Sequence, residues 1–246
     1  MHNLERRPII KLLVGSHNYN LNGEGSDRDY KVFVMPTFED LYKGNTHHDS
    51  ILSESEDWDV QDIRKLPHLL FKSNLNYIET LYSVDKEMYA TDYRIEELVK
   101  WLFDKKAELV TMNLSYLYST CIAMHYTAMK YIEQDKSTAS SIHLMGKYGF
   151  DTKQAMNAYR ILDFLERFYH TEFKDLKKAM WYEGQARDTI LNFKFGKYSK
   201  AQFLEIAEEK LLAIRGIRHY YEQPPNYELK KELDEAIMEI VRLGVK

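Results

Sequence analysis

The first third of the chain alternates short apolar runs with polar loops, a pattern that is typical of β-strands joined by turns. One apolar run spans residues 9–14, and a second, residues 27–35, ends before Pro36. Both have the length of a strand, and a proline there ends strand pairing. Residues 51–55 and 57–60 predict two further strands or a hairpin. We therefore expect a small sheet near the N-terminus.

After the predicted strands, apolar residues recur at the spacing of an α-helix. Residues 62–73 carry apolar side chains at helical intervals, with Asp62 as the N-cap and Pro67 expected to kink or delay the helix. From about residue 85 the strand signals stop and long amphipathic patterns follow one another. The helices predicted there are 93–110, 112–133, 151–169, 200–221 and 227–243.

This change of pattern predicts an α+β protein with two domains, a mixed-sheet domain at 1–84 and an all-helical domain at 85–246. The 246 residues are enough for a sizeable core, and 44% hydrophobic with 29% charged residues indicates an ordinary globular protein. A net charge of −4 argues against a broad basic surface for long nucleic acid, although a local basic patch stays open.

The chain has a single cysteine, Cys121, so no intrachain disulfide can form. We expect a buried thiol in a helix, in a protein of a reducing compartment. Lys11 interrupts the first apolar run, so no targeting segment is visible, and no stretch has the length of a membrane span. These observations predict a cytoplasmic protein without a membrane partner.

Candidate chemistry lies at the first two strands. Gly15-Ser16 directly follows the first strand, where a glycine allows a sharp turn and close approach of a phosphate. A helix beginning at Ser16 or His17 would point free N–H groups at an anion. Asp27 and Asp29 are two residues apart in an extended segment, so both carboxylates share one face and can hold a divalent cation.

The order of these motifs resembles the DNA-polymerase-β nucleotidyltransferase superfamily. The flanking residues Tyr19-Asn20-Leu21 and Ser26-Asp27-x-Asp29 are similar to its RlaP-type branch, nucleotidyltransferases linked to RNA repair. Two later blocks, 59–83 and 146–162, are similar to that branch too, so the resemblance touches both halves of the chain. It implies a polymerase-β palm-like catalytic domain at 1–84.

The resemblance further implies transfer of a nucleoside monophosphate from an NTP such as ATP to a hydroxyl, with release of pyrophosphate. Two Mg²⁺ ions, for which Mn²⁺ can substitute, would be held by Asp27, Asp29 and a third carboxylate. The family's third acidic position aligns best with Asp59, and Asp57 and Asp62 remain open as alternatives.

For the nucleotide, Gly15 and Ser16 are joined by a second basic element formed by Lys147, Lys153 and Arg160. Asp151 predicts a helix start, and Lys153, Asn157 and Arg160 lie three to four residues apart on one helix face. Such a face suits a triphosphate or an acceptor, and a solvated charged face explains the spacing equally well. The family block often has a histidine at the position of Asn157, whose role stays open.

The acceptor that we expect is an RNA end, such as that of a tRNA. A second hypothesis is nucleotidylation of a partner protein, and a third is a fold that binds nucleotide without turnover. The sequence leaves open which NTP is used and the oligomeric state, although the helical half has apolar faces enough for a homodimer.

Overall fold

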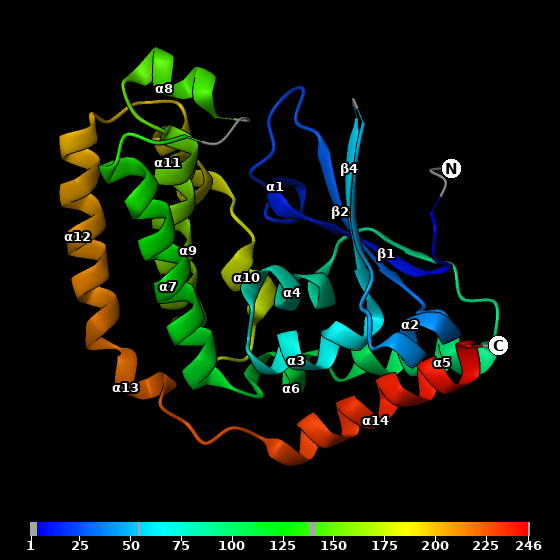
Figure 1. Cartoon of the computed structure of the whole chain (residues 1–246). Coiled ribbons are helices and arrows are strands. Elements are labelled where there is room, and N and C mark those ends of the chain that lie inside the picture. The colour runs from blue at the N-terminus through cyan, green and yellow to red at the C-terminus, as the bar shows by residue number, and fades with distance from the viewer. Residues whose placement is uncertain (1–3, 54, 138–140, 246) are drawn as a thin grey trace. The chain divides into compact units, whose positions relative to one another are not determined.

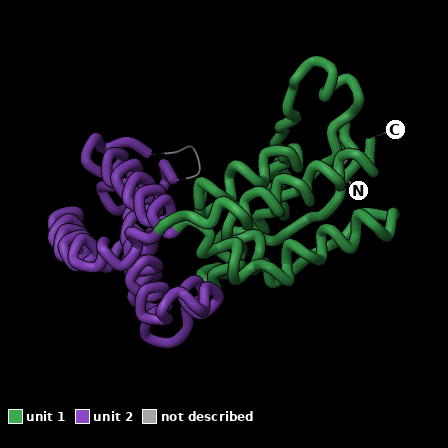
Figure 2. The backbone as a smooth tube through the Cα atoms, turned by 90° about the horizontal axis from the view of Figure 1, so that it is seen from below, with its two compact units in different colours: residues 1–113, 224–246 green, residues 114–223 purple. Residues whose placement is uncertain are grey.

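The computed structural model describes residues 4–53, 55–137 and 141–245. It is an α+β protein in which a five-stranded mixed sheet is followed by a helical region (Figure 1). The chain divides into two compact units (Figure 2). Unit 1 comprises residues 1–113 and 224–246, and unit 2 comprises residues 114–223.

The sheet belongs to unit 1 and has the strand order β3-β4-β2-β1-β5. Its central pair, β2 with β4, is parallel, and the other pairs are antiparallel. The parallel register sets Asp29 opposite Asp57 and Lys31 opposite Asp59. The strands are β1 (Pro8–Val14), β2 (Arg28–Val34), β3 (His48–Leu52), β4 (Glu56–Asp62) and β5 (Lys86–Met88).

The alternation of side chains along β2 and β4 separates an apolar face from a polar one. Tyr30 and Val32 of β2 pack with Trp58 and Val60 of β4, and Leu13 of β1 joins this buried cluster. The residues between them point to the opposite face, because successive side chains in a strand alternate. Asp29 and Lys31 of β2 therefore lie on the same side of the sheet as Asp57 and Asp59 of β4.

The strands predicted at 9–14 and 27–35 and the hairpin at 51–60 are confirmed, with shifts of a few residues at their ends. The expectation that no strand follows residue 85 is wrong, because β5 pairs with β1 through residues 86–88. This strand has three residues, two of them exposed and charged. It therefore lacks the apolar alternation from which a strand can be predicted.

The segment after β4 begins helically, as predicted. The Asp62 carboxylate accepts a hydrogen bond from the backbone N–H of Arg64, at 3.0 Å, and so caps the first turn. Pro67 lies in the first turn of α3, where its missing N–H leaves no broken bond, so it delays the α-helix without kinking it. The helices of this part of unit 1 are α1 (Gly15–Asn18), α2 (Phe38–Lys43), η1 (Ile63–Lys65), α3 (Leu66–Phe71), α4 (Leu75–Ile78) and η2 (Glu79–Tyr82).

Unit 1 is completed by helices from far along the chain. The last helix, α14 (Tyr227–Gly244), packs against α3 and α5 (Tyr93–Asp104), as Figure 1 shows for α5. The carbonyl of Gly244 accepts a hydrogen bond from the Arg7 guanidinium at 2.8 Å. Near the other end of α14, the Asn226 N–H donates to the Met112 carbonyl at 2.8 Å. The chain therefore returns to unit 1 close to where it left it, and unit 2 is an insertion.

The boundary expected at residue 84 differs from the division into units. It falls inside unit 1, because α5, α6 (Lys106–Thr111) and α14 belong with the sheet. The sequence pattern marks where the strand signals stop. It does not indicate against which core a helix buries its apolar face.

Unit 2 is helical and is built around α9 (Thr152–His170), which packs against five of its other helices. The remaining helices are α7 (Leu114–Glu133), α8 (Ile142–Tyr148), α10 (Leu176–Met180), α11 (Gly184–Lys194), α12 (Lys200–Gly216) and α13 (Arg218–Tyr221). The predicted long helices are found, two of them divided by short breaks, whereas α8, α10 and α11 were not predicted. Cys121 is buried in α7 as expected, and burial raises the pKa of its thiol to about 12.

Among the residues that the structure describes, no helix is both long enough and apolar enough to cross a membrane.

The packing of α14 can be tested with two variants of the same helix. The side chain of Ile240 is fully buried, whereas Met238 is 66% exposed. Ile240→Ala should destabilise the protein by about 2–4 kcal/mol, because it removes buried methyl groups and leaves a cavity. Met238→Ala should change the free energy of unfolding by less than about 0.5 kcal/mol. Urea unfolding measures both, and equal effects would contradict the proposed role of α14 in unit 1.

Candidate metal centre

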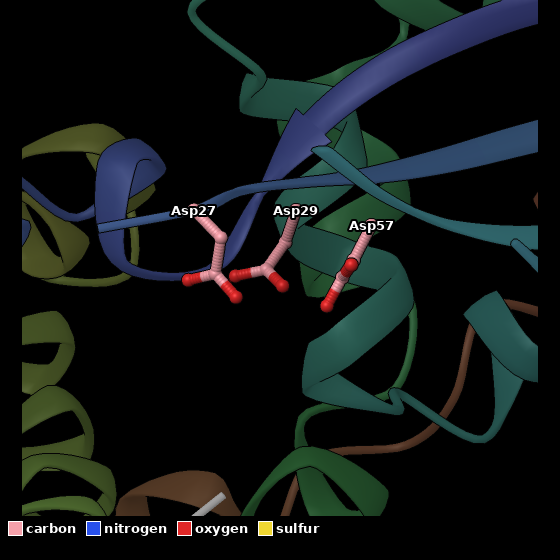
Figure 3. A group of neighbouring side chains, drawn as sticks. All are labelled: Asp27, Asp29 and Asp57. Atoms are coloured by element: carbon pink, nitrogen blue, oxygen red, sulfur yellow. The ribbon is translucent and has the colours of Figure 1, made fainter. Parts of the chain in front are cut away.

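Three carboxylates converge at one end of the sheet. Asp27, Asp29 and Asp57 each offer a carboxylate oxygen, and these oxygens lie within 4.8 Å of one another (Figure 3). In the described part of the chain, no other group of three or more His, Cys, Asp or Glu side chains meets this spacing. Asp27 is exposed, and the other two are half-buried. All three are open enough to share a ligand.

The strands determine this convergence. Asp29 lies in β2 and Asp57 lies opposite it in β4, where the parallel pairing puts both side chains on the same face. Asp27 comes just before β2, two residues from Asp29, and points to the same side in Figure 3. Asp27 and Asp29 were expected to share a face, and the structure brings them together.

Gly15 directly follows β1, beside Asp29, and a glycine is required there for two reasons. Its φ of +70° is a conformation that other residues rarely adopt. A Cβ at this position would also lie 2.5 Å from Oδ2 of Asp29, closer than two such atoms approach. The glycine therefore makes room for the carboxylate.

Glu79, at the start of η2, is a functional candidate for which no role was predicted from the sequence. It is 3% exposed, and its Oε2 accepts a hydrogen bond from the Gly15 N–H at 3.0 Å. The N–H of Gly15 is therefore bound within the protein. The short helix α1 has four residues and leaves Ser16 half-buried beside the site.

Asp59 was expected as the third carboxylate, but the structure puts Asp57 in the group instead. The register explains the difference, because Asp57 is the residue opposite Asp29, whereas Asp59 lies opposite Lys31. The Asp59 carboxylate accepts hydrogen bonds from Lys31 and Gln61. The other alternative, Asp62, is fully buried and bound by Arg64, with Nε 2.9 Å from Oδ1.

Burial by itself would raise the pKa of Asp59, but the residues that bind its carboxylate lower the pKa by more. The hydrogen bond and positive charge of Lys31 lower the pKa, and Gln61 and His48 add to the effect, so that the net shift is downward. His48 Nε2 lies 3.4 Å from Oδ1 of Asp59. Asp59 is therefore held as a carboxylate by an ion pair within the protein.

An open pocket of about 290 Å³ extends from the three-carboxylate site along this face of the sheet. Its volume lies at the small end of the range for ligand cavities, roughly 300–1,000 Å³. Polar side chains lie along the pocket beside the carboxylates. Those that line it are Asp29, Asp57, Asp59, Lys31, Ser50, Asn76 and Glu79.

The basic residues predicted to bind nucleotide belong to unit 2. Lys147 is exposed at the end of α8, and Lys153 is half-buried in the first turn of α9, which Asp151 caps as predicted. Arg160 was expected to bind nucleotide from the same helix face as Lys153 and Asn157, and its side chain is 8% exposed. It lies in the interior of the unit, because α9 is covered by helices on several sides.

Comparison with models of known protein families finds no match to this chain. Comparison with curated proteins finds no match either. A function has therefore to be inferred from the site itself.

The close approach of Gly15 to Asp29 can be tested against a second glycine. Gly15→Ala and Gly25→Ala both force alanine into a positive φ, which costs roughly 1–2 kcal/mol. Only at Gly15 does the new methyl group meet a neighbour, because nothing lies within 4 Å at Gly25. Gly15→Ala should therefore lower the free energy of unfolding by more than Gly25→Ala in urea titrations. Equal losses would mean that Asp29 is not held against Gly15.

The ion pair of Asp59 predicts how stability depends on pH. Its lowered pKa means that the carboxylate stabilises the fold above its ordinary pKa of 3.8, and that this contribution is lost as the pH falls through the lower value in the fold. Lys31→Met removes the positive charge beside Asp59 but keeps the carboxylate partly buried, so the pKa of Asp59 should rise. A ¹³Cγ titration of labelled aspartate measures the shift. An unchanged pKa would exclude Lys31 as the cause.

Proposed function

We propose that the chain is a Mg²⁺-dependent nucleotidyltransferase, with a polymerase-β palm-like fold in unit 1. It transfers a nucleoside monophosphate from an NTP to a hydroxyl acceptor and releases pyrophosphate. The observation that carries this proposal is the convergence of Asp27, Asp29 and Asp57 on one face of the sheet, next to Gly15-Ser16.

The donor set fits the metal. All three side chains offer carboxylate oxygens, the ligands that Mg²⁺ prefers, and Mg²⁺ often takes substrate phosphates as further ligands. Two Mg²⁺ ions, or Mn²⁺ in their place, would be held by Asp27, Asp29 and Asp57. When bound, such ions neutralise the charge on the phosphates and make the acceptor hydroxyl more acidic.

The surrounding residues keep this arrangement in place. Glu79 fixes the backbone of Gly15, and Gly15 leaves the space that the Asp29 carboxylate occupies. Ser16 follows directly and supplies a hydroxyl for the triphosphate. Binding of a triphosphate or an acceptor by Lys147 and Lys153, which belong to unit 2, stays a prediction from the sequence.

The acceptor that we propose is an RNA end, such as that of a tRNA. Incubation of the protein with each α-³²P-labelled NTP, Mg²⁺ and total RNA tests this directly. Label that appears on RNA supports the proposal and identifies the donor nucleotide. Label on a protein supports nucleotidylation of a partner, and nucleotide binding without transfer of label contradicts the enzymatic proposal.

Asp57→Asn is the sharpest variant for this assay, because it tests the residue that the geometry assigns to the site. Label transfer should fall by roughly 100-fold or more, since charge stabilisation at the reacting phosphate depends on the ions. Mn²⁺ binding, followed by calorimetry without nucleotide, should weaken as well. Asp49→Asn is the matched control, because Asp49 is exposed on β3 and pairs with Val60 of the apolar face.

The proposed metal site is contradicted if Asp57→Asn binds Mn²⁺ and transfers label as the wild-type protein does. The double variant Asp27→Ala/Asp29→Ala extends the test to the other two carboxylates. It should lose both metal binding and label transfer.

A further inference from the structure

A second row of polar residues crosses the sheet next to the carboxylates, and the proposed metal site does not use it. Ser50 of β3, Asp59 of β4 and Lys31 of β2 lie side by side in register. All three line the same pocket as Asp29 and Asp57, and Asn76 of α4 lines it too. We call Ser50, Asp59 and Lys31 the second row.

The position of the second row follows from strand geometry. Asp59 is two residues beyond Asp57, and Lys31 is two residues beyond Asp29. Residues two apart in a strand are separated by about 7 Å and point to the same face. In a nucleotide, one ester oxygen and one carbon link the phosphate to the sugar ring. If the phosphate lies at the carboxylates, the sugar therefore reaches about as far as the second row.

The second row differs in charge from the site beside it. Lys31 and Asp59 form an ion pair, so together they are neutral, whereas Asp27, Asp29 and Asp57 have only negative charge. Lys31 is 5% exposed, and its Nζ lies 4.3 Å from the centre of the Tyr77 ring. A neutral pair offers little attraction to a phosphate, so the second row suits an uncharged ligand group.

The second row nevertheless retains capacity for hydrogen bonds. The side chain of Asp59 is 40% exposed, and a carboxylate has about four acceptor sites, more than Lys31, Gln61 and His48 occupy. Ser50 is exposed at the edge of the sheet and has a hydroxyl that both donates and accepts. A ligand with hydroxyl groups can therefore bind both residues.

We propose that the second row is a subsite for the hydroxyl groups of a sugar, with Asp59 accepting hydrogen bonds from the sugar and Ser50 completing the contact. This inference rests on the proposed nucleotidyl transfer and adds a ligand group to it. The sugar is either the ribose of the donor nucleotide or the terminal ribose of the acceptor. Lys31 is a positioning residue, because it holds Asp59 in the orientation that faces the pocket.

The test measures binding, so that it does not depend on turnover. The four ribonucleoside α,β-methylene triphosphates are compared with their 2′,3′-dideoxy forms by calorimetry in the presence of Mn²⁺. A carbon atom replaces the bridging oxygen at the bond that the reaction breaks, so the ligands stay intact. The wild-type protein should bind at least one ribose form roughly tenfold more tightly than its dideoxy form, as expected for two hydrogen bonds.

A second comparison distinguishes the two sources of the sugar. A short RNA with a terminal 2′,3′-diol is compared with the same RNA ending in a dideoxy nucleotide. Discrimination among the triphosphates assigns the second row to the donor, and discrimination among the RNAs assigns it to the acceptor.

Two variants and a control connect the discrimination to the second row. Lys31→Met/Asp59→Val removes the ion pair without changing the net charge and should abolish the discrimination. Ser50→Ala, a small change at an exposed edge position, should reduce it and serves as the independent test if the double variant does not fold. Asp49→Asn, which alters the neighbour of Ser50 on the other face of β3, should retain it.

The outcomes separate the subsite from the function on which it rests. Binding of triphosphates without discrimination in either comparison overturns the subsite and leaves the proposed function standing. The subsite is also overturned if Ser50→Ala and the folded double variant still prefer the ribose ligand over its dideoxy form. If no triphosphate binds in the presence of Mn²⁺, the proposed function fails, and the subsite fails with it.

Discussion

The parallel pairing of β2 with β4 is the constraint on which the site depends. It sets Asp29 opposite Asp57, and Asp27 completes the group from the residues just before β2. A shift of this register by one residue would turn every side chain of one strand to the other face. The apolar cluster around Val32 and Val60 opposes such a shift, because it would expose buried side chains. The core of unit 1 therefore fixes the positions of the carboxylates.

Around this pair, the protein satisfies its buried polar groups with its own residues. The Gly15 N–H is bound by Glu79, and Lys31 is bound by Asp59, so neither is left unpaired in a largely buried position. The three carboxylates differ from these pairs, because they bring negative charges together, with oxygens that lie within 4.8 Å of one another. Like charges at this separation repel one another, and a bound cation would relieve the repulsion.

The sequence predicted the local parts of this arrangement better than the long-range ones. Asp27 and Asp29 are neighbours along the chain, so the two-residue period of a strand is enough to bring them together. The choice between Asp57 and Asp59 depends on the register of β2 and β4, which are separated along the chain by α2 and β3, and spacing alone does not determine it. Glu79 shows the same limit, because its partner Gly15 lies 64 positions away. The expected boundary at residue 84 differs from the division into units for a related reason, because an amphipathic pattern does not indicate the core against which a helix packs.

The insertion of unit 2 has a consequence for the order in which the protein folds during synthesis. Residues 114–223 are contiguous and can collapse as soon as they leave the ribosome. Unit 1 has to wait, because the buried side chains of α14 come from residues 227–244. During that interval the apolar surface that α14 later covers stays exposed to water and to other nascent chains. The unit that carries the carboxylates therefore completes its core only after unit 2 has been synthesised.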